Sequence, residues 1–227
     1  MIPLRDVIPT RTFPAVTVAL VALNVLSFAV LLALDTGTAE WIVRRFGFVP
    51  ATAAWHATLT SLFLHTGWLH LASNALVLWL FGENLEDRMG HLRFLAFYLL
   101  CAVVVLLAHA AFEPRASVPA IGSSGAVAGV MGAYFRMYRR SRVLTLVPLF
   151  VVVHIVEVPA AFFLGLWAVV QILAGPGVAP GTTYPGAAGG LSPVALLAGF
   201  AAGAALVTVF RRAERLRVEW WGGETGR

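Results

Sequence analysis

The sequence predicts an all-α membrane protein, a polytopic bundle of six transmembrane helices. Hydrophobic residues make up 59% of the 227 residues and charged residues only 12%, whereas about 25% of an ordinary soluble domain is charged. The mean hydropathy is +0.85, and a chain of this length has room for about six helices of ~20 residues with short connections. The composition therefore excludes a soluble domain and makes the lipid bilayer a partner of the chain.

Six apolar runs are expected to form the helices. They cover residues 15–34, 68–81, 92–112, 120–138, 158–174 and 191–210. Residues 1–14 form an extended N-terminal arm, residues 15–210 the membrane domain and residues 211–227 a basic tail. The second and fourth runs are short for a hydrocarbon core of about 30 Å, so we expect these two helices to be sheltered inside the bundle. The first run is too long for the apolar region of a cleavable signal peptide and is expected to remain as a helix.

Arginine placement predicts the orientation of the chain. Thirteen of the sixteen basic residues lie in the arm, after the second and fourth runs and after the sixth run. The other three, Arg44, Arg45 and Arg115, follow odd-numbered runs. Under the positive-inside rule both termini then lie in the cytoplasm. The isoelectric point near 10.3 is thus a signal of topology, and no nucleic-acid partner is expected.

The stretch Ile121–Tyr134 is the most informative segment of the sequence. Its glycines at positions 125, 129 and 132 follow a three-to-four spacing, so a helix here would carry a stripe almost free of side chains. Such a stripe lets neighbouring helices approach closely, and Ser123 and Ser124 lie near the entry end of that helix. One interpretation is a serine held in fixed geometry for chemistry. The alternative is a packing helix whose serines bond back to the preceding turn.

Further polar groups are predicted at the same depth in the membrane. Ser124 lies about 6 Å below the outer end of its helix at 1.5 Å per residue. His70 and Asn74, four residues apart, project from one face of the second helix into the same outer layer. An intramembrane polar cluster is by default a hypothesis for a functional site. The alternative is a set of interhelical hydrogen bonds that only holds the bundle together.

These motifs resemble those of the rhomboid family of intramembrane serine proteases. Gly122-Ser123-Ser124-Gly125 corresponds to the family's Gly-x-Ser-Gly motif, and His70 with Asn74 corresponds to its His-x-x-x-Asn motif. The resemblance implies a six-helix rhomboid-like bundle in a bacterial inner membrane, with transmembrane segments of other proteins as substrates or clients. It also implies that Ser124 is the nucleophile and that His70, Asn74 and the backbone N–H of Ser124 form the oxyanion hole. We expect neither a cofactor nor a metal ion, and the oligomeric state is left open.

The sequence departs from the family at the general base. The family carries a histidine on the sixth helix within Ala-His-x-x-Gly-Phe, and here Ala195-Leu196-Leu197-Ala198-Gly199-Phe200 has a leucine in its place. Leucine cannot accept a proton, and loss of the nucleophile or the base of a serine protease reduces turnover about a millionfold. Recruitment of His65 or His109 as the base would need a rearranged site, since nucleophile and base must come within ~3 Å.

Two functions therefore remain open. The first is an intramembrane serine endopeptidase that is impaired by loss of its base. The second is a pseudoprotease that binds transmembrane clients without cleaving them. A channel or transporter is disfavoured, because ionisable residues are scarce within the predicted spans.

Overall fold

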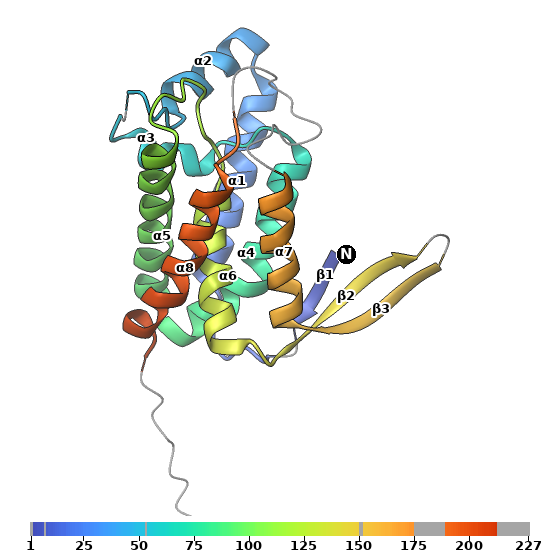
Figure 1. Ribbon diagram of the computed structural model, residues 1–227. Coiled ribbons are helices and arrows are strands. Elements are labelled where there is room, and N and C mark those ends of the chain that lie inside the picture. The colour runs from blue at the N-terminus through green and yellow to red at the C-terminus, as the bar shows by residue number, and fades with distance from the viewer. Residues whose placement is uncertain (1, 7, 53, 150–151, 175–188, 213–227) are drawn as a thin grey trace, which may run out of the picture.

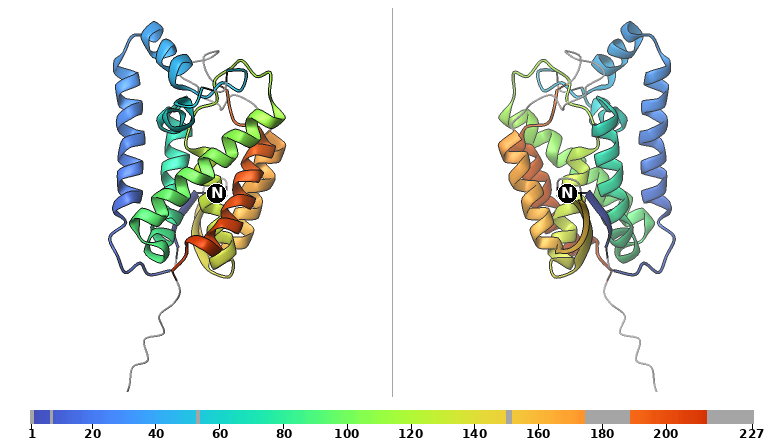
Figure 2. Two further views of the ribbon diagram at one scale, coloured as in Figure 1. Left: turned by 90° about the vertical axis from the view of Figure 1, so that its left-hand side faces the viewer. Right: turned by 90° about the vertical axis from the view of Figure 1, so that its right-hand side faces the viewer.

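A bundle of upright helices forms the body of the protein (Figure 1). The computed structural model describes all residues except 1, 7, 53, 150–151, 175–188 and 213–227. The long helices are α1 (Ala15–Ala33), α4 (Trp68–Met89), α5 (His91–Phe112), α6 (Ser124–Tyr138), α7 (Ala160–Ala174) and α8 (Pro193–Phe210). The described residues thus contain the six helices that were predicted, and α1 lies at one edge of the bundle with α7 and α8 at the other (Figure 2).

Helix α6 lies at the centre of the bundle. It contacts α4, α5, α7 and α8, and every residue from Gly125 to Tyr134 is buried. This confirms the prediction that the fourth apolar run is sheltered. The helix begins at Ser124 rather than at residue 120, because the backbone of Gly122 has a φ of +111°, which no α-helix accommodates.

Glycines allow α6 and α8 to pack backbone against backbone. A Cβ atom at Gly203 would collide with the backbone of Gly129, and one at Gly132 would collide with the backbone of Phe200. One turn earlier, Gly199 lies beside the carbonyl oxygen of Gly125. The two helices therefore run parallel. The predicted glycine stripe packs against both α5 and α8, because a Cβ atom at Gly125 or Gly129 would meet Val105 or Cys101 of α5.

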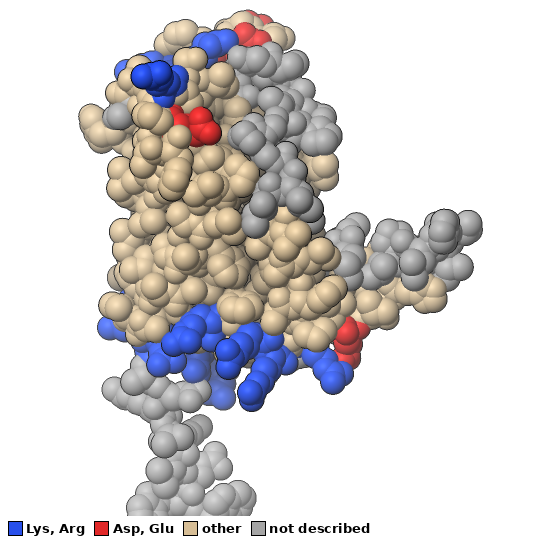
Figure 3. Space-filling view, in the orientation of Figure 1, with Lys and Arg blue, Asp and Glu red and all other residues tan. Residues whose placement is uncertain are grey.

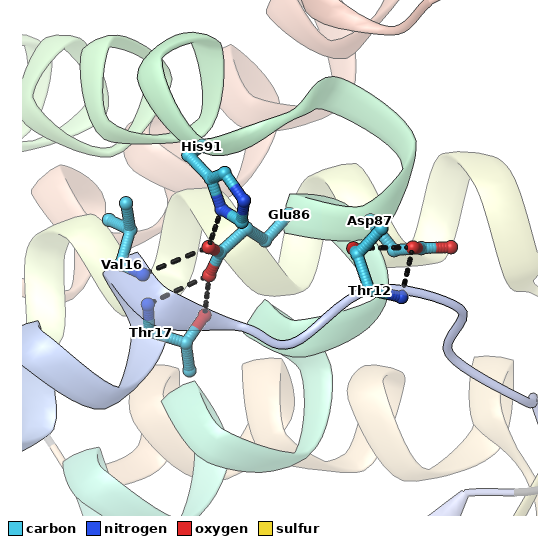
Figure 4. Close-up of polar contacts among 6 residues, drawn as sticks. All are labelled: Thr12, Val16, Thr17, Glu86, Asp87 and His91. Carbon is cyan, nitrogen blue, oxygen red and sulfur yellow. Dashed lines mark hydrogen bonds and ion pairs between the residues drawn. The ribbon is translucent and has the colours of Figure 1, made fainter.

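The second predicted helix is longer than the sequence indicates. Helix α4 has 22 residues and continues through a charged segment to Met89. The side chain of Glu86 explains the extension, because its carboxylate accepts hydrogen bonds from the backbone N–H groups of Val16 (2.9 Å) and Thr17 (2.8 Å) and from the Thr17 hydroxyl (2.7 Å). His91 Nδ1 lies 2.5 Å from the same carboxylate. The first turn of α1, whose cap residue is a proline without a capping side chain, is thus capped by α4 (Figure 4).

A three-stranded antiparallel sheet corrects the all-α prediction. Strand β1 (Ile2–Asp6) pairs with β2 (Arg142–Leu149), which pairs with β3 (Val152–Pro159). The sequence predicts only a connection after α6, but this region is rich in Val, Leu and Ile, residues that favour strands. Pro148 also disfavours a helix there. Consequently the fifth helix begins at Ala160. Residues Ile2–Asp6 of the predicted extended arm form an edge strand of this sheet.

The ends of the bundle differ in their chemistry. One end carries α2 (Thr36–Phe46), α3 (Ala57–Thr60) and the 3₁₀ helix Ser61–Phe63. Asp35 caps α2 by accepting a hydrogen bond from Thr38 N at 3.0 Å, and the bonds to Thr38 lower the pKa of this exposed carboxyl. Arginines gather at the other end, which also carries the sheet (Figure 3).

Three of the described helices, α1, α5 and α8, are long and apolar enough to cross a membrane, and α7 contains a shorter apolar stretch. Helix α6 has 15 residues, and its residues from Gly125 to Tyr134 are buried. The predicted basic tail, residues 211–227, falls largely outside the described residues, which end at Arg212.

Candidate active site

Ser124 is the first residue of α6, and its position is set by the preceding glycine. The positive φ of Gly122 lies in the left-handed region that favours glycine. Its N–H donates a hydrogen bond of 2.8 Å to the carbonyl oxygen of Ser61. A Cβ atom at Gly122 would also run into the imidazole ring of His70. The entry to α6 is therefore held between the Ser61 backbone and His70, which brings the predicted His70 next to the serine motif.

His70 and Asn74 lie one turn apart on α4, as predicted from their spacing. The Thr66 hydroxyl lies 3.1 Å from His70 Nδ1, and a hydrogen bond donated there would leave the imidazole proton on Nε2, on the side of Gly122. Asn74 is buried, and its side-chain N–H₂ group has no hydrogen-bond partner among the described residues. A buried amide donor without a partner is costly, so it is suited to a negatively charged oxygen that forms only during a reaction.

A second histidine lies beside the first serine of the motif. The Nε2 atom of His65 is 3.4 Å from Ser123 Oγ, and both side chains are buried. His65 sits in the connection before α4, with its ring edge-on to that of His70 at a centroid distance of 5.1 Å. Burial, helped by His70, lowers the pKa of His65 to about 3, which keeps it neutral. The sequence does not predict this contact, because His65 and Ser123 are 58 residues apart and belong to different segments.

Leu196 is the fourth residue of α8. Gly199, three residues later, lies beside the carbonyl oxygen of Gly125, so Leu196 lies about 4.5 Å nearer the outer end than Gly199 at 1.5 Å per residue, within about one helical turn of the level of Ser124. The side chain is only 6% exposed and packs in an apolar cluster that includes Val105, Ala128 and Leu191. The leucine is thus a packed core residue of the α5–α6–α8 interface.

The remaining histidines are engaged elsewhere. His109 Nδ1 accepts a hydrogen bond of 3.3 Å from Ser192 N, just before α8. His56 contacts Arg45, His91 contacts Glu86 at the arginine-rich end, and His154 is exposed on β3. All six histidines lie among the residues that the structure describes, and none of them makes a hydrogen bond to Ser124 there. No group of three or more metal-binding side chains was found among the described residues.

The described residues bring a histidine of α4 against the entry to the serine-bearing helix α6. Ser124 stands at a helix N-terminus, where backbone N–H groups and the helix dipole favour an anion, and the imidazole of His70 lies against Gly122, two residues earlier. Comparison with known proteins then decides the family, because residues 52–213 match the rhomboid domain. The chain belongs to the rhomboid family. Membership in this family makes it a polytopic membrane protein and a homologue of intramembrane proteases.

Similar proteins occur in bacteria and in plant organelles. The chain is 35% identical over 124 residues to the rhomboid protease GluP of Bacillus subtilis (strain 168). The aligned region covers 53% of this chain and 24% of that protein. It is 32% identical over 95 residues to the putative rhomboid protease YdcA of the same organism, covering 42% and 47% of the two chains. A match to the chloroplastic rhomboid-like protein 11 of Arabidopsis thaliana has 36% identity over 77 residues, covering 34% and 27%. The matched regions span less than half the length of these relatives.

Proposed function

We propose that the protein is a rhomboid-type intramembrane serine endopeptidase homologue that acts on transmembrane segments, with hydrolysis strongly impaired by loss of the general base. The observation that carries the proposal is that His70 lies against Gly122 at the entry to the helix that begins with Ser124, while a buried leucine occupies position 196 on the neighbouring helix α8. Two relatives with the word protease in their names support the reaction class.

The proposed roles follow from the chemistry of acyl transfer. Ser124 Oγ would attack a peptide carbonyl, and the developing oxyanion would accept hydrogen bonds from His70, Asn74 Nδ2 and the Ser124 backbone N–H. A serine hydroxyl is a weak nucleophile unless a base takes its proton. Leu196 cannot do so, and the hydrogen bond of His65 goes to Ser123 rather than to Ser124. Residual activity would then depend on the oxyanion donors alone.

A specific observation favours the alternative, a client-binding pseudoprotease. Leu196 is packed within an apolar cluster, while the glycine contacts between α6 and α8 remain intact. A site that has lost chemistry but keeps its packing can still bind a transmembrane helix.

The proposed placement is a bacterial inner membrane with both termini in the cytoplasm. The support is the band of exposed arginines at one end of the bundle, formed by Arg93, Arg136, Arg139, Arg140, Arg142, Arg211 and Arg212 (Figure 3). Under the positive-inside rule this end faces the cytoplasm, and the end with Ser124 faces outward.

The decisive experiment restores the base. Purified wild type, Leu196→His and the matched control Leu197→His, which lies on another side of α8, are reconstituted with a model transmembrane substrate. A fluorophosphonate probe is used in parallel, and the modified serine is located by mass spectrometry. We expect cleavage and labelling to rise by orders of magnitude only in Leu196→His and to vanish when Ser124→Ala is added.

Other outcomes would contradict the proposal in distinguishable ways. Wild-type cleavage at the rate of Leu196→His, dependent on Ser124, would show that no base is missing. Labelling of Ser123, lost in His65→Gln, would move the nucleophile to the serine that contacts His65. If Leu196→His folds but neither cleaves nor reacts with the probe, the pseudoprotease alternative is favoured instead.

A further inference from the structure

The hairpin formed by β2 and β3 projects sideways from the helical bundle, past α7 (Figure 1). It leaves the bundle at the border between the apolar side surface and the arginine band (Figure 3). Arg136, Arg139, Arg140 and Arg142, all exposed, lie between the last turns of α6 and the start of β2. The hairpin therefore begins at the level where the surface changes from apolar to strongly basic.

Both faces of the hairpin carry apolar side chains. The register pairs Val143 with Val158 and Thr145 with Val156 on one face, and Leu146 with Ile155 on the other. Antiparallel strands with one face in water normally alternate apolar and polar residues. Val143, Thr145 and Val158 are buried, whereas Ile155 is 61% and Val156 39% exposed.

The formal charges of the hairpin's described residues cancel, leaving one histidine, His154, as a further titratable group. The two charged residues among them, Arg142 and Glu157, form an ion pair of 2.8 Å at the end nearest the helices. Beyond that pair, the described residues 143–146 and 154–156 carry no carboxylate, lysine or arginine. An apolar, uncharged segment next to a basic band is the pattern of an element that lies in a membrane interface.

The sheet order limits how deep the hairpin can lie. Strand β3 is an edge strand of the sheet, so in the described residues its outer backbone edge has no strand partner. Backbone N–H and C=O groups without partners are not tolerated in the hydrocarbon core, whereas water and lipid headgroups satisfy them at the interface. This geometry excludes a spanning or deeply inserted hairpin and leaves the boundary between headgroups and acyl chains.

We infer that the β2–β3 hairpin is an interfacial anchor, which lies in the boundary of the arginine-rich leaflet while the neighbouring arginines bind anionic lipid headgroups. The inference is independent of whether the protein cleaves peptides. Charge complementarity selects the occupant, because arginines near a surface of anionic lipid are attracted to it. The apolar faces that the protein leaves bare are then covered by lipid.

The test places an environment-sensitive NBD label on Ile155→Cys, with Val156→Cys as a second site on the other face. The native Cys101 is fully buried, and Cys101→Ala removes it as a competing thiol. Glu113→Cys, in the exposed turn after α5, is the control. The labelled full-length protein is reconstituted in vesicles of equal amounts of phosphatidylcholine and phosphatidylglycerol, and quenching by aqueous iodide is compared with quenching by lipids spin-labelled near the headgroup or near the chain end.

We expect both hairpin labels to resist iodide and to be quenched most by the shallow spin label, at a depth of about 5–10 Å, while the control is quenched by iodide. Replacing Arg139 and Arg140 by glutamine should weaken this protection in vesicles with phosphatidylglycerol and leave it unchanged in pure phosphatidylcholine. Iodide quenching equal to that of the control, or strongest quenching by the chain-end label, would overturn the inference. Protection that disappears when the protein is diluted into excess lipid would assign the apolar faces to a second copy of the chain instead.

Discussion

The carboxylate of Glu86 provides the sharpest test of how the bundle is held together. Its side chain is fully buried and accepts hydrogen bonds from two backbone N–H groups and one hydroxyl in the first turn of α1, with His91 as a fourth neighbour. We predict that Glu86→Ala destabilises the protein by about 3–4 kcal/mol. Hydrogen bonds to a charged group contribute roughly 1.5–3 kcal/mol each, and the value is less than their sum because water can reach some of the freed donors.

Two further variants make the prediction specific. Glu86→Gln keeps the shape but turns an N–H₂ group toward a backbone donor, so we expect a loss of about 2 kcal/mol. The matched control is Asp87→Ala, which removes a neighbouring carboxylate bonded to Thr12 N at 3.0 Å and Thr12 Oγ1 at 2.7 Å in an exposed setting (Figure 4). Exposed contacts of this kind contribute about 1 kcal/mol or less.

The assay is thermal unfolding in detergent, followed by intrinsic tryptophan fluorescence. For a chain of this size 1 kcal/mol corresponds to about 2–4 °C in Tm, so Glu86→Ala should lower Tm by about 6–16 °C. The reasoning is refuted if Glu86→Ala and Asp87→Ala lower Tm equally. It is also refuted if Glu86→Gln has no effect, since burial and geometry would then not distinguish the two carboxylates.

Two predictions concern the glycines. Gly203→Ala should lower Tm by about 2–12 °C, because overpacking a helix contact costs roughly 1–3 kcal/mol. The control Gly165→Ala, where an added Cβ meets nothing within 4 Å, should be neutral or stabilising. Equal Tm values would contradict the backbone contact between α6 and α8. In the Leu196→His background, Gly122→Ala should abolish the expected labelling by the fluorophosphonate probe. Alanine is strained at a φ of +111°, and its Cβ atom would displace His70. Undiminished labelling would argue against His70 as a member of the site.

Much of the fold could be predicted from local signals in the sequence. Apolar runs located six helices, and the spacing of Gly125, Gly129 and Gly132 marked the face of α6 that packs against α5 and α8. The sheet was missed because the Val- and Leu-rich segment after α6 lies between two apolar runs, where periodicity does not separate a strand from a connection. The length of α4 was missed because its last turns are charged, and only the contact of Glu86 with α1 explains why they are helical.

The candidate site likewise contains some residues that the sequence predicts and one contact that it does not. His70 and Asn74 share a helix face, so their spacing alone placed them together. The contact of His65 with Ser123 arises from the connection before α4 folding over the start of α6, and no pattern along the chain encodes that approach. The depth of Leu196 was inferred from a motif, and the glycine contacts between α6 and α8 put it within about one helical turn of the level of Ser124.

The apolar surroundings of Leu196 connect the thermal stability of the protein with its capacity for catalysis. A leucine buried in the same apolar cluster as Val105 and Ala128 contributes burial energy that an imidazole at this position would lose, since a polar ring there needs a hydrogen-bond partner. If the proposed function is correct, Leu196→His would gain turnover and lose thermal stability.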